Sequence, residues 1–126
     1  MGTWIEKKFG KYPYKQYSFI QGGDGGMEYA MATLLKGAGD DVIYHEWVHS
    51  WFQMALGTNE LLNAWMDEGF TQWTENQILS RLYKDSTAFA QEDSYNAYFE
   101  LVKSEIEEPL STHGCAGECD WRIKCW

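Results

Sequence analysis

The sequence predicts an α+β fold, in which a small antiparallel or mixed sheet segment comes first and three helices follow. Short apolar stretches broken by a glycine-rich turn occupy the beginning of the chain, whereas longer stretches with helical apolar spacing occupy the remainder. The chain has 126 residues, including seven Trp, eight Tyr and six Phe, which is enough for one modest domain with a packed core. One sheet with helices packed on one side is the architecture that this order favours.

The first third of the chain contains the expected strands. Residues 1–17 are polar, basic and aromatic and predict an irregular lead-in, after which residues 17–20 form a short strand. Residues 21–26 contain four glycines and predict a turn, and residues 27–35 follow as a second strand at a candidate edge. The glycines resemble a phosphate loop superficially. That interpretation fails because no Gly-Lys-Ser/Thr end and no acidic partner about 20 residues later are present.

Three helices are expected after the break at residues 37–39. They cover residues 41–56, 64–83 and 88–108. Asp40 or Asp41 can cap the first of these helices, and Gly57 can end it. Residues 85–87 can cap the third helix, which Pro109 stops. No internal repeat is present.

The most informative pattern in the chain is His45-Glu46-Trp47-Val48-His49, followed by Glu68. Two histidines four residues apart lie on one face of a helix, so both imidazoles can reach one metal ion. Glu68, on the next predicted helix, supplies a third ligand. Zn²⁺ held by three protein ligands keeps one position open for water and lowers the pKa of that water from about 16 towards ~7. Glu46 can accept the proton of this water and later donate it to a leaving amine. The pattern predicts metal-assisted hydrolysis with Glu46 as general base and acid.

The alternative to a zinc site is a surface helix that carries an i,i+4 histidine pair. The apolar stretch from Val42 to Leu56 argues against it, because the motif does not lie on a polar face. Glu75 lies seven residues after Glu68 and on the same helical face. It is either a carboxylate that accepts the second N–H of a ligating histidine or an ordinary exposed helix glutamate.

The net charge of −9 argues against nucleic acid and anionic membrane surfaces as partners. The acidity serves either solubility or the attraction of a cationic group such as the free amino terminus of a peptide. No apolar run approaches the ~20 residues of a membrane span, and residues 1–11 lack the apolar region of a signal peptide. The chain is therefore expected to be soluble, and the sequence does not indicate a compartment.

Two motifs together resemble the zinc aminopeptidases of the gluzincin group, which include alanyl and leucyl aminopeptidases and leukotriene hydrolase. The first is the zinc motif, with eighteen residues between His49 and Glu68 and with Trp65-Met66-Asp67-Glu68-Gly69-Phe70 around the glutamate. The second is Gly25-Gly26-Met27-Glu28-Tyr29, which is similar to the family's Gly-x-Met-Glu-Asn exopeptidase motif. The resemblance covers roughly residues 12–112.

The resemblance implies a fold, an activity and further site residues. The fold is a gluzincin, thermolysin-like catalytic core, here partial, over residues 1–112. The activity is the removal of amino-terminal residues from peptides by one Zn²⁺ ion bound to His45, His49 and Glu68. In the family the second motif lies on a strand that lines the cleft, and its glutamate binds the free amino group of the substrate. Glu28 takes that role, and Gly26 and Met27 lie beside the peptide main chain.

The chain departs from the family pattern in two respects. Tyr29 stands where the family usually has Asn, and the family's oxyanion-stabilising tyrosine is matched by no residue of this sequence. The flanking domains of the family are also not matched. Loss of one oxyanion donor costs ~10²–10³ in rate. The alternative function is therefore a folded zinc-binding fragment with little or no turnover.

Residues 113–126 change character and form a divergent, Cys-rich tail. All three cysteines lie here, so no disulfide framework holds the body of the domain. The tail is compatible with a second metal site, although it lacks a Cys-x-x-Cys pair. It is also compatible with a Cys119–Cys125 disulfide loop or with a non-functional or foreign extension. The candidate ligands of a metal site in the tail are His113, Cys115, Cys119 and Cys125.

Overall fold

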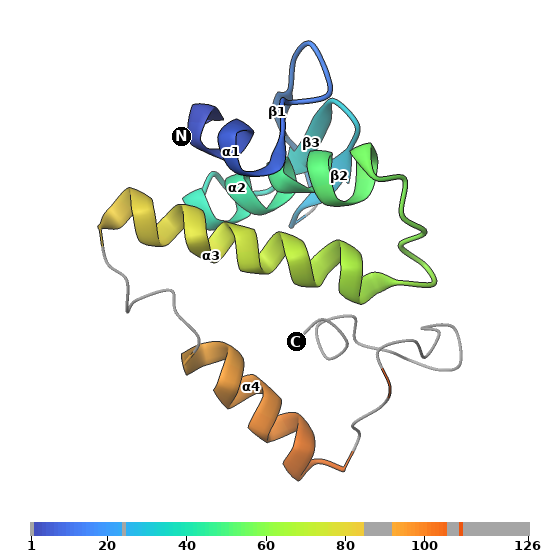
Figure 1. Cartoon of the computed structure of the whole chain (residues 1–126), viewed down its shortest axis with the longest axis vertical. Coiled ribbons are helices and arrows are strands. Elements are labelled where there is room, and N and C mark those ends of the chain that lie inside the picture. Colours follow the sequence, from blue (N-terminus) through green and yellow to red (C-terminus); the bar gives the residue numbers. More distant parts are fainter. Residues whose placement is uncertain (1, 24, 85–91, 106–108, 110–126) are drawn as a thin grey trace.

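The computed structural model describes residues 2–23, 25–84, 92–105 and 109. Within this part the chain is mixed α and β, with four α-helices, two π-helical segments and a three-stranded sheet. Helix α2 is the middle layer, because it contacts strands β2 and β3 on one side and helix α3 on the other (Figure 1). None of the described helices is long and apolar enough to cross a membrane.

The chain begins with a helix, so the prediction of an irregular lead-in over residues 1–17 is wrong. Helix α1 spans Gly2–Phe9, and Gly10, with φ of 98°, follows its end. The helix forms because Ile5 is buried against Val48, Trp51 and Ile78. The carbonyl of Gly10 accepts a hydrogen bond from the Trp51 indole at 2.9 Å and fixes the end of α1 on the core.

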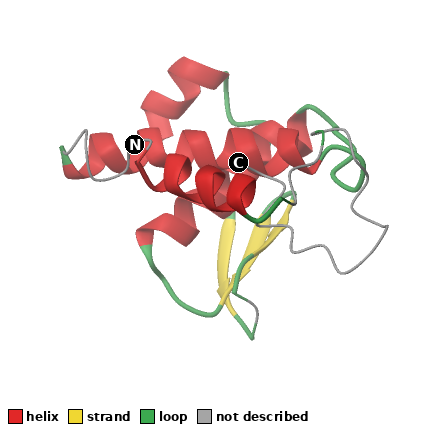
Figure 2. Ribbon diagram, turned by 90° about the horizontal axis from the view of Figure 1, so that it is seen from below, coloured by secondary structure: helices red, strands yellow, loops and turns green. Residues whose placement is uncertain are grey.

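The sheet is mixed and has the strand order β1-β3-β2. Strand β1 (Ser18–Gln21) pairs in parallel with β3 (Ala32–Leu35), and β2 (Met27–Tyr29) pairs antiparallel with β3. The single strand predicted over residues 27–35 is therefore wrong. A turn at residues 30–31 folds this segment into a hairpin, which buries Thr33 and Leu35 of β3 beneath the helices. The strands lie together at one side of the helical layer (Figure 2).

The histidine helix has two parts. Helix α2 (Asp40–His49) continues as the π-helical segment η1 (Ser50–Ala55), in agreement with the predicted range. Its N-cap is Gly39, without a side-chain hydrogen bond, so the expected capping by Asp40 or Asp41 is wrong. Both aspartates lie in the first turn, where their negative charge interacts favourably with the helix dipole and stabilises the helix. Gly57, with φ of 65°, ends the segment and donates its N–H to the Gln53 carbonyl at 2.8 Å.

The second predicted helix also begins with a π-helical turn. Segment η2 (Trp65–Gly69) leads into helix α3 (Phe70–Tyr83), which runs along α2. Helix α4 (Glu92–Lys103) confirms the middle of the third predicted helix. The predicted cap at residues 85–87 and the tail at residues 113–126 lie outside the described residues.

The core lies between α1, α2, η1 and α3. Its buried residues are Ile5, Val48, Trp51 and Ile78, surrounded by six partly buried aromatic side chains: Trp4, Phe9, Tyr12, Tyr44, Trp47 and Phe52. This packing fixes α2 against α3 and thereby sets the distance between the histidines and Glu68.

Candidate metal centre

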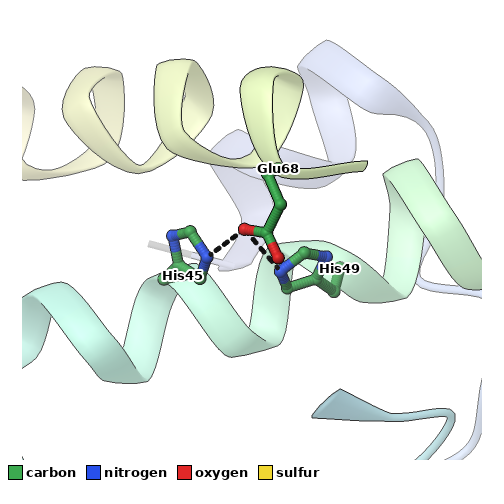
Figure 3. Close-up of side chains that lie close together, drawn as sticks. All are labelled: His45, His49 and Glu68. Carbon is green, nitrogen blue, oxygen red and sulfur yellow. Dashed lines mark hydrogen bonds and ion pairs between the residues drawn. The ribbon is translucent and has the colours of Figure 1, made fainter. Parts of the chain in front are cut away.

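Helix α2 and segment η2 bring together three side chains that could hold a metal ion. His45 and His49 lie one turn apart on α2, with ring centroids 5.0 Å apart, and Glu68 reaches them from η2 (Figure 3). Glu68 Oε2 lies 3.0 Å from His45 Nε2 and 3.7 Å from His49 Nε2. The three donor atoms all lie within 4.8 Å of one another.

The donor set fits a zinc ion. Donor atoms about 2.0–2.1 Å from a tetrahedral ion lie about 3.3 Å apart, and the two distances from Glu68 Oε2 bracket that value. The Nδ1 atom of each imidazole is also engaged by a carboxylate. His45 Nδ1–H donates to Glu75 Oε2 at 3.0 Å, and His49 Nδ1–H donates to Asp67 Oδ1 at 2.6 Å. Both Nε2 atoms are therefore the nitrogens left for an ion.

Sequence reasoning named Glu75 but missed Asp67. The signal was present, because Asp67 adjoins Glu68 and the second histidine had no carboxylate assigned to it. The Thr71 hydroxyl lies 3.4 Å from the same Nδ1 atom of His49 and was also missed. Glu75 is in turn held by the Gln72 amide, which donates to Glu75 Oε2 at 2.8 Å.

The carboxylates around the histidines control their protonation. Burial alone would lower the pKa of His45, but hydrogen bonds and negative charge from Glu68 and Glu75 raise it to about 10. The pKa of His49 is raised in the same sense, because the hydrogen bond and charge of Asp67 outweigh burial. The pKa of Glu68 is lowered, since its contacts with the two histidines outweigh its burial. An ion at this site therefore competes with protons.

Glu46 lies on the sheet side of the same helix, and its environment suits proton transfer. Its side chain is buried, and its Oε2 atom has no hydrogen-bond partner within the described part of the chain. Burial raises the pKa of Glu46 to about 7, although the charges of His45 and His49 act against the rise. A carboxyl with a pKa near neutrality can both accept and donate a proton at physiological pH.

The glycine motif lies against this glutamate. A Cβ atom at Gly26 would collide with Glu46 Oε1, so the absence of a side chain at Gly26 leaves room for the carboxylate. Glu28, on β2, offers a carboxylate oxygen within 4.8 Å of donor atoms of His49 and Asp67, and burial raises the pKa of Glu28. The Met27 carbonyl accepts a hydrogen bond from Thr33 Oγ1 at 2.9 Å, whereas the Met27 side chain is exposed. The structure thus brings the two sequence motifs together.

The comparison with protein-family models gives a match to the peptidase family M1 domain over residues 30–113, which are 84 of the 126 residues. This chain belongs to peptidase family M1. The matched range contains five candidate site residues of this chain, namely His45, Glu46, His49, Glu68 and Glu75. It begins just after Glu28, so the interpretation of the glycine motif depends on its residues and its geometry.

Two kinds of curated relative of the M1 chain were found. Aminopeptidase B of Homo sapiens is 34% identical over 89 residues, which are 62% of this chain and 14% of that protein. Leucine aminopeptidase 2 of Chaetomium globosum is 33% identical over 72 residues, which are 52% of this chain and 12% of that protein. The chain thus spans 14% or less of the length of these relatives. No solved structure gives a significant match.

Proposed function

We propose that residues 1–112 form the metal-binding core of a zinc aminopeptidase of the gluzincin, thermolysin-like type, with residues 113–126 as a separate tail. The observation that carries the proposal is the pair of carboxylate-backed imidazoles whose Nε2 atoms face Glu68. Such a set is typical of catalytic zinc centres that keep one position open. Membership of the M1 family and the names of the curated relatives support peptide hydrolysis as the reaction.

The roles of the residues follow from their positions. His45, His49 and Glu68 hold one Zn²⁺, which when bound polarises the scissile carbonyl and makes water more acidic. Glu46 takes the proton from the attacking water and returns it to the leaving amine, as its pKa near 7 allows. Glu75 keeps the proton of His45 on Nδ1.

Glu28 is proposed to bind the free amino group of a peptide. Its carboxylate lies close to the metal centre, on a strand at the edge of the sheet, so an ammonium group bound there would place the first peptide bond near Glu46. The backbone at Gly26 and Met27 runs beside the peptide main chain in this arrangement. Peptides with a free amino terminus are therefore the proposed substrates.

A zinc-binding module with little turnover is the second candidate. One contact favours it. The hydroxyl of Tyr17, which lies beside Glu46, donates to the Glu46 backbone carbonyl at 2.8 Å and is therefore not directed towards a substrate. A chain that lacks an oxyanion donor would bind the ion and lose ~10²–10³ in rate.

Metal analysis and one variant separate these candidates. We expect about one zinc per chain in protein purified without chelator, and an equal content in Glu46→Gln, which keeps all three ligands. Release of an aminoacyl anilide by the wild type, abolished in Glu46→Gln, would establish the enzyme. Zinc binding without release would establish the module. Absence of zinc from the wild type would exclude both.

The aminopeptidase assignment is tested at Glu28. Glu28→Gln removes the charge and keeps the size of the side chain, so it should raise KM for free-amine substrates and leave amino-blocked substrates almost unaffected. If the wild type cleaves blocked peptides as well as free ones, the enzyme is a peptidase of another specificity.

A further inference from the structure

Asp67 is a buried carboxylate in contact with a metal-ligating histidine. The Asp67 side chain is 4% exposed and that of His49 is 1% exposed. Asp67 Oδ1 lies 2.6 Å from His49 Nδ1. Burying a carboxylate costs several kcal/mol unless a charged or hydrogen-bonding partner compensates. The His49 Nδ1–H supplies that partner, so each group determines the position of the other.

Asp67 and Glu68 both reach helix α2 from the π-helical turn η2. Consecutive side chains on an α-helix point about 100° apart. In η2 the hydrogen bonds run from i to i+5, and the wider turn reduces the angle between neighbours. Asp67 contacts Nδ1 of His49, while Glu68 faces the Nε2 atoms of both histidines.

We propose that Asp67 is a positioning residue that keeps the proton of His49 on Nδ1 and presents Nε2 to the metal. The inference rests on the proposed zinc site and adds the residue that orients its second histidine. Asp67 mirrors Glu75, which contacts Nδ1 of His45 from helix α3. The charge of Asp67 also makes the imidazole a more basic ligand, so it strengthens zinc binding as well as orienting the ring.

The Thr71 hydroxyl is the competing explanation for the orientation of His49. It lies 3.4 Å from the same Nδ1 atom, whereas the Asp67 carboxylate lies 2.6 Å from it. The hydroxyl also lacks the negative charge of the carboxylate. Hydrogen bonds to ionised acceptors are roughly twice as strong as those between neutral groups. Asp67 therefore dominates at this nitrogen, and Thr71→Val provides a matched control from the same wall of the site.

The test compares zinc affinities by competition with a chromogenic chelator, with circular dichroism to confirm that each variant is folded. Asp67→Asn keeps the size and one acceptor but removes the charge, and we expect zinc affinity to fall about 10–100-fold. Thr71→Val should change affinity much less. Unchanged affinity in Asp67→Asn, or an equal loss in Thr71→Val, overturns the proposal and leaves the zinc site intact. A wild type that binds no zinc overturns the zinc site itself.

A second measurement needs no variant. In the zinc-loaded wild type, long-range ¹H–¹⁵N NMR of the histidine side chains distinguishes the two ring nitrogens. We expect His49 to carry a hydrogen-bonded proton on Nδ1 and to bind zinc through Nε2. Binding through Nδ1 overturns the proposal, even if Asp67→Asn does not fold.

Discussion

The proton balance of metal binding provides a sharp test of the proposed zinc site. In the metal-free protein the pKa of His45 is about 10, because Glu68 and Glu75 hold its proton. At pH 8 such a group is about 99% protonated, whereas an imidazole with the ordinary pKa near 6.5 is about 3% protonated. Zinc binds neutral imidazole, so each zinc should displace about one proton from His45, and the raised pKa of His49 adds to this release. Between pH 7 and 9 the apparent affinity should rise about tenfold or more per pH unit.

Isothermal titration calorimetry at pH 8, in buffers with different ionisation enthalpies, measures the number of protons released. At this pH Glu46, with a pKa of about 7, is mostly ionised already and contributes little. Glu75→Gln is the matched control, because it removes one of the two carboxylates that hold the proton on His45. It should lower the pH at which the affinity stops rising. Release of less than about 0.3 protons by the wild type would mean that both histidines are neutral in the metal-free protein, contrary to the contacts described above.

Three further predictions concern the fold. Ile78→Ala creates a cavity in the fully buried core and should reduce the free energy of unfolding by about 2–5 kcal/mol in urea titrations; a loss below about 1 kcal/mol would contradict the packing. Tyr17→Phe removes the hydrogen bond to the Glu46 carbonyl and should cost about 0.5–1.5 kcal/mol, whereas Tyr95→Phe on the exposed surface of α4 should cost almost nothing. Gly57→Ala introduces a side chain at φ of 65° and should lower the free energy of unfolding by about 1 kcal/mol. Gly23 has open space around it, so Gly23→Ala should not lower it. Equal melting temperatures for the two variants would contradict the left-handed conformation of Gly57.

The helices that carry the site could be predicted from sequence because their signals are local. Gly57 marks the end of the histidine helix, and the i,i+4 spacing of His45 and His49 fixes their common face. Helix α1 was missed because the burial of Ile5 depends on residues 43 or more positions away in the sequence. The hairpin was missed because the segment from Met27 to Leu35 is almost continuously apolar through its turn, with only Glu28 and Thr33 polar, so the pattern resembles one long strand.

The site, like the fold, could be predicted where its signals are local and was missed where it depends on packing between segments. The prediction named Glu75 as a candidate partner of a histidine, and the structure places it 3.0 Å from His45 Nδ1. Asp67 was not named as a partner, although it adjoins Glu68, because its contact with His49 depends on how η2 lies against the histidine helix. Segment η2 is π-helical, and no residue type in the sequence announces such a turn. The proximity of Gly26 to Glu46 likewise arises only when β2 packs on α2.

The strand order β1-β3-β2 has a consequence for the colloidal behaviour of the chain. Among the described residues, neither β1 nor β2 has a strand partner on its outer edge, and Phe19, Ile20 and Tyr29 on these strands are about half exposed. Apolar edge strands are templates for pairing between molecules. The net charge of −9 opposes such contacts, but its reach falls to about 10 Å at 0.1 M salt and to about 3 Å at 1 M. We therefore expect a rise in ionic strength to favour edge-to-edge pairing between copies of this chain.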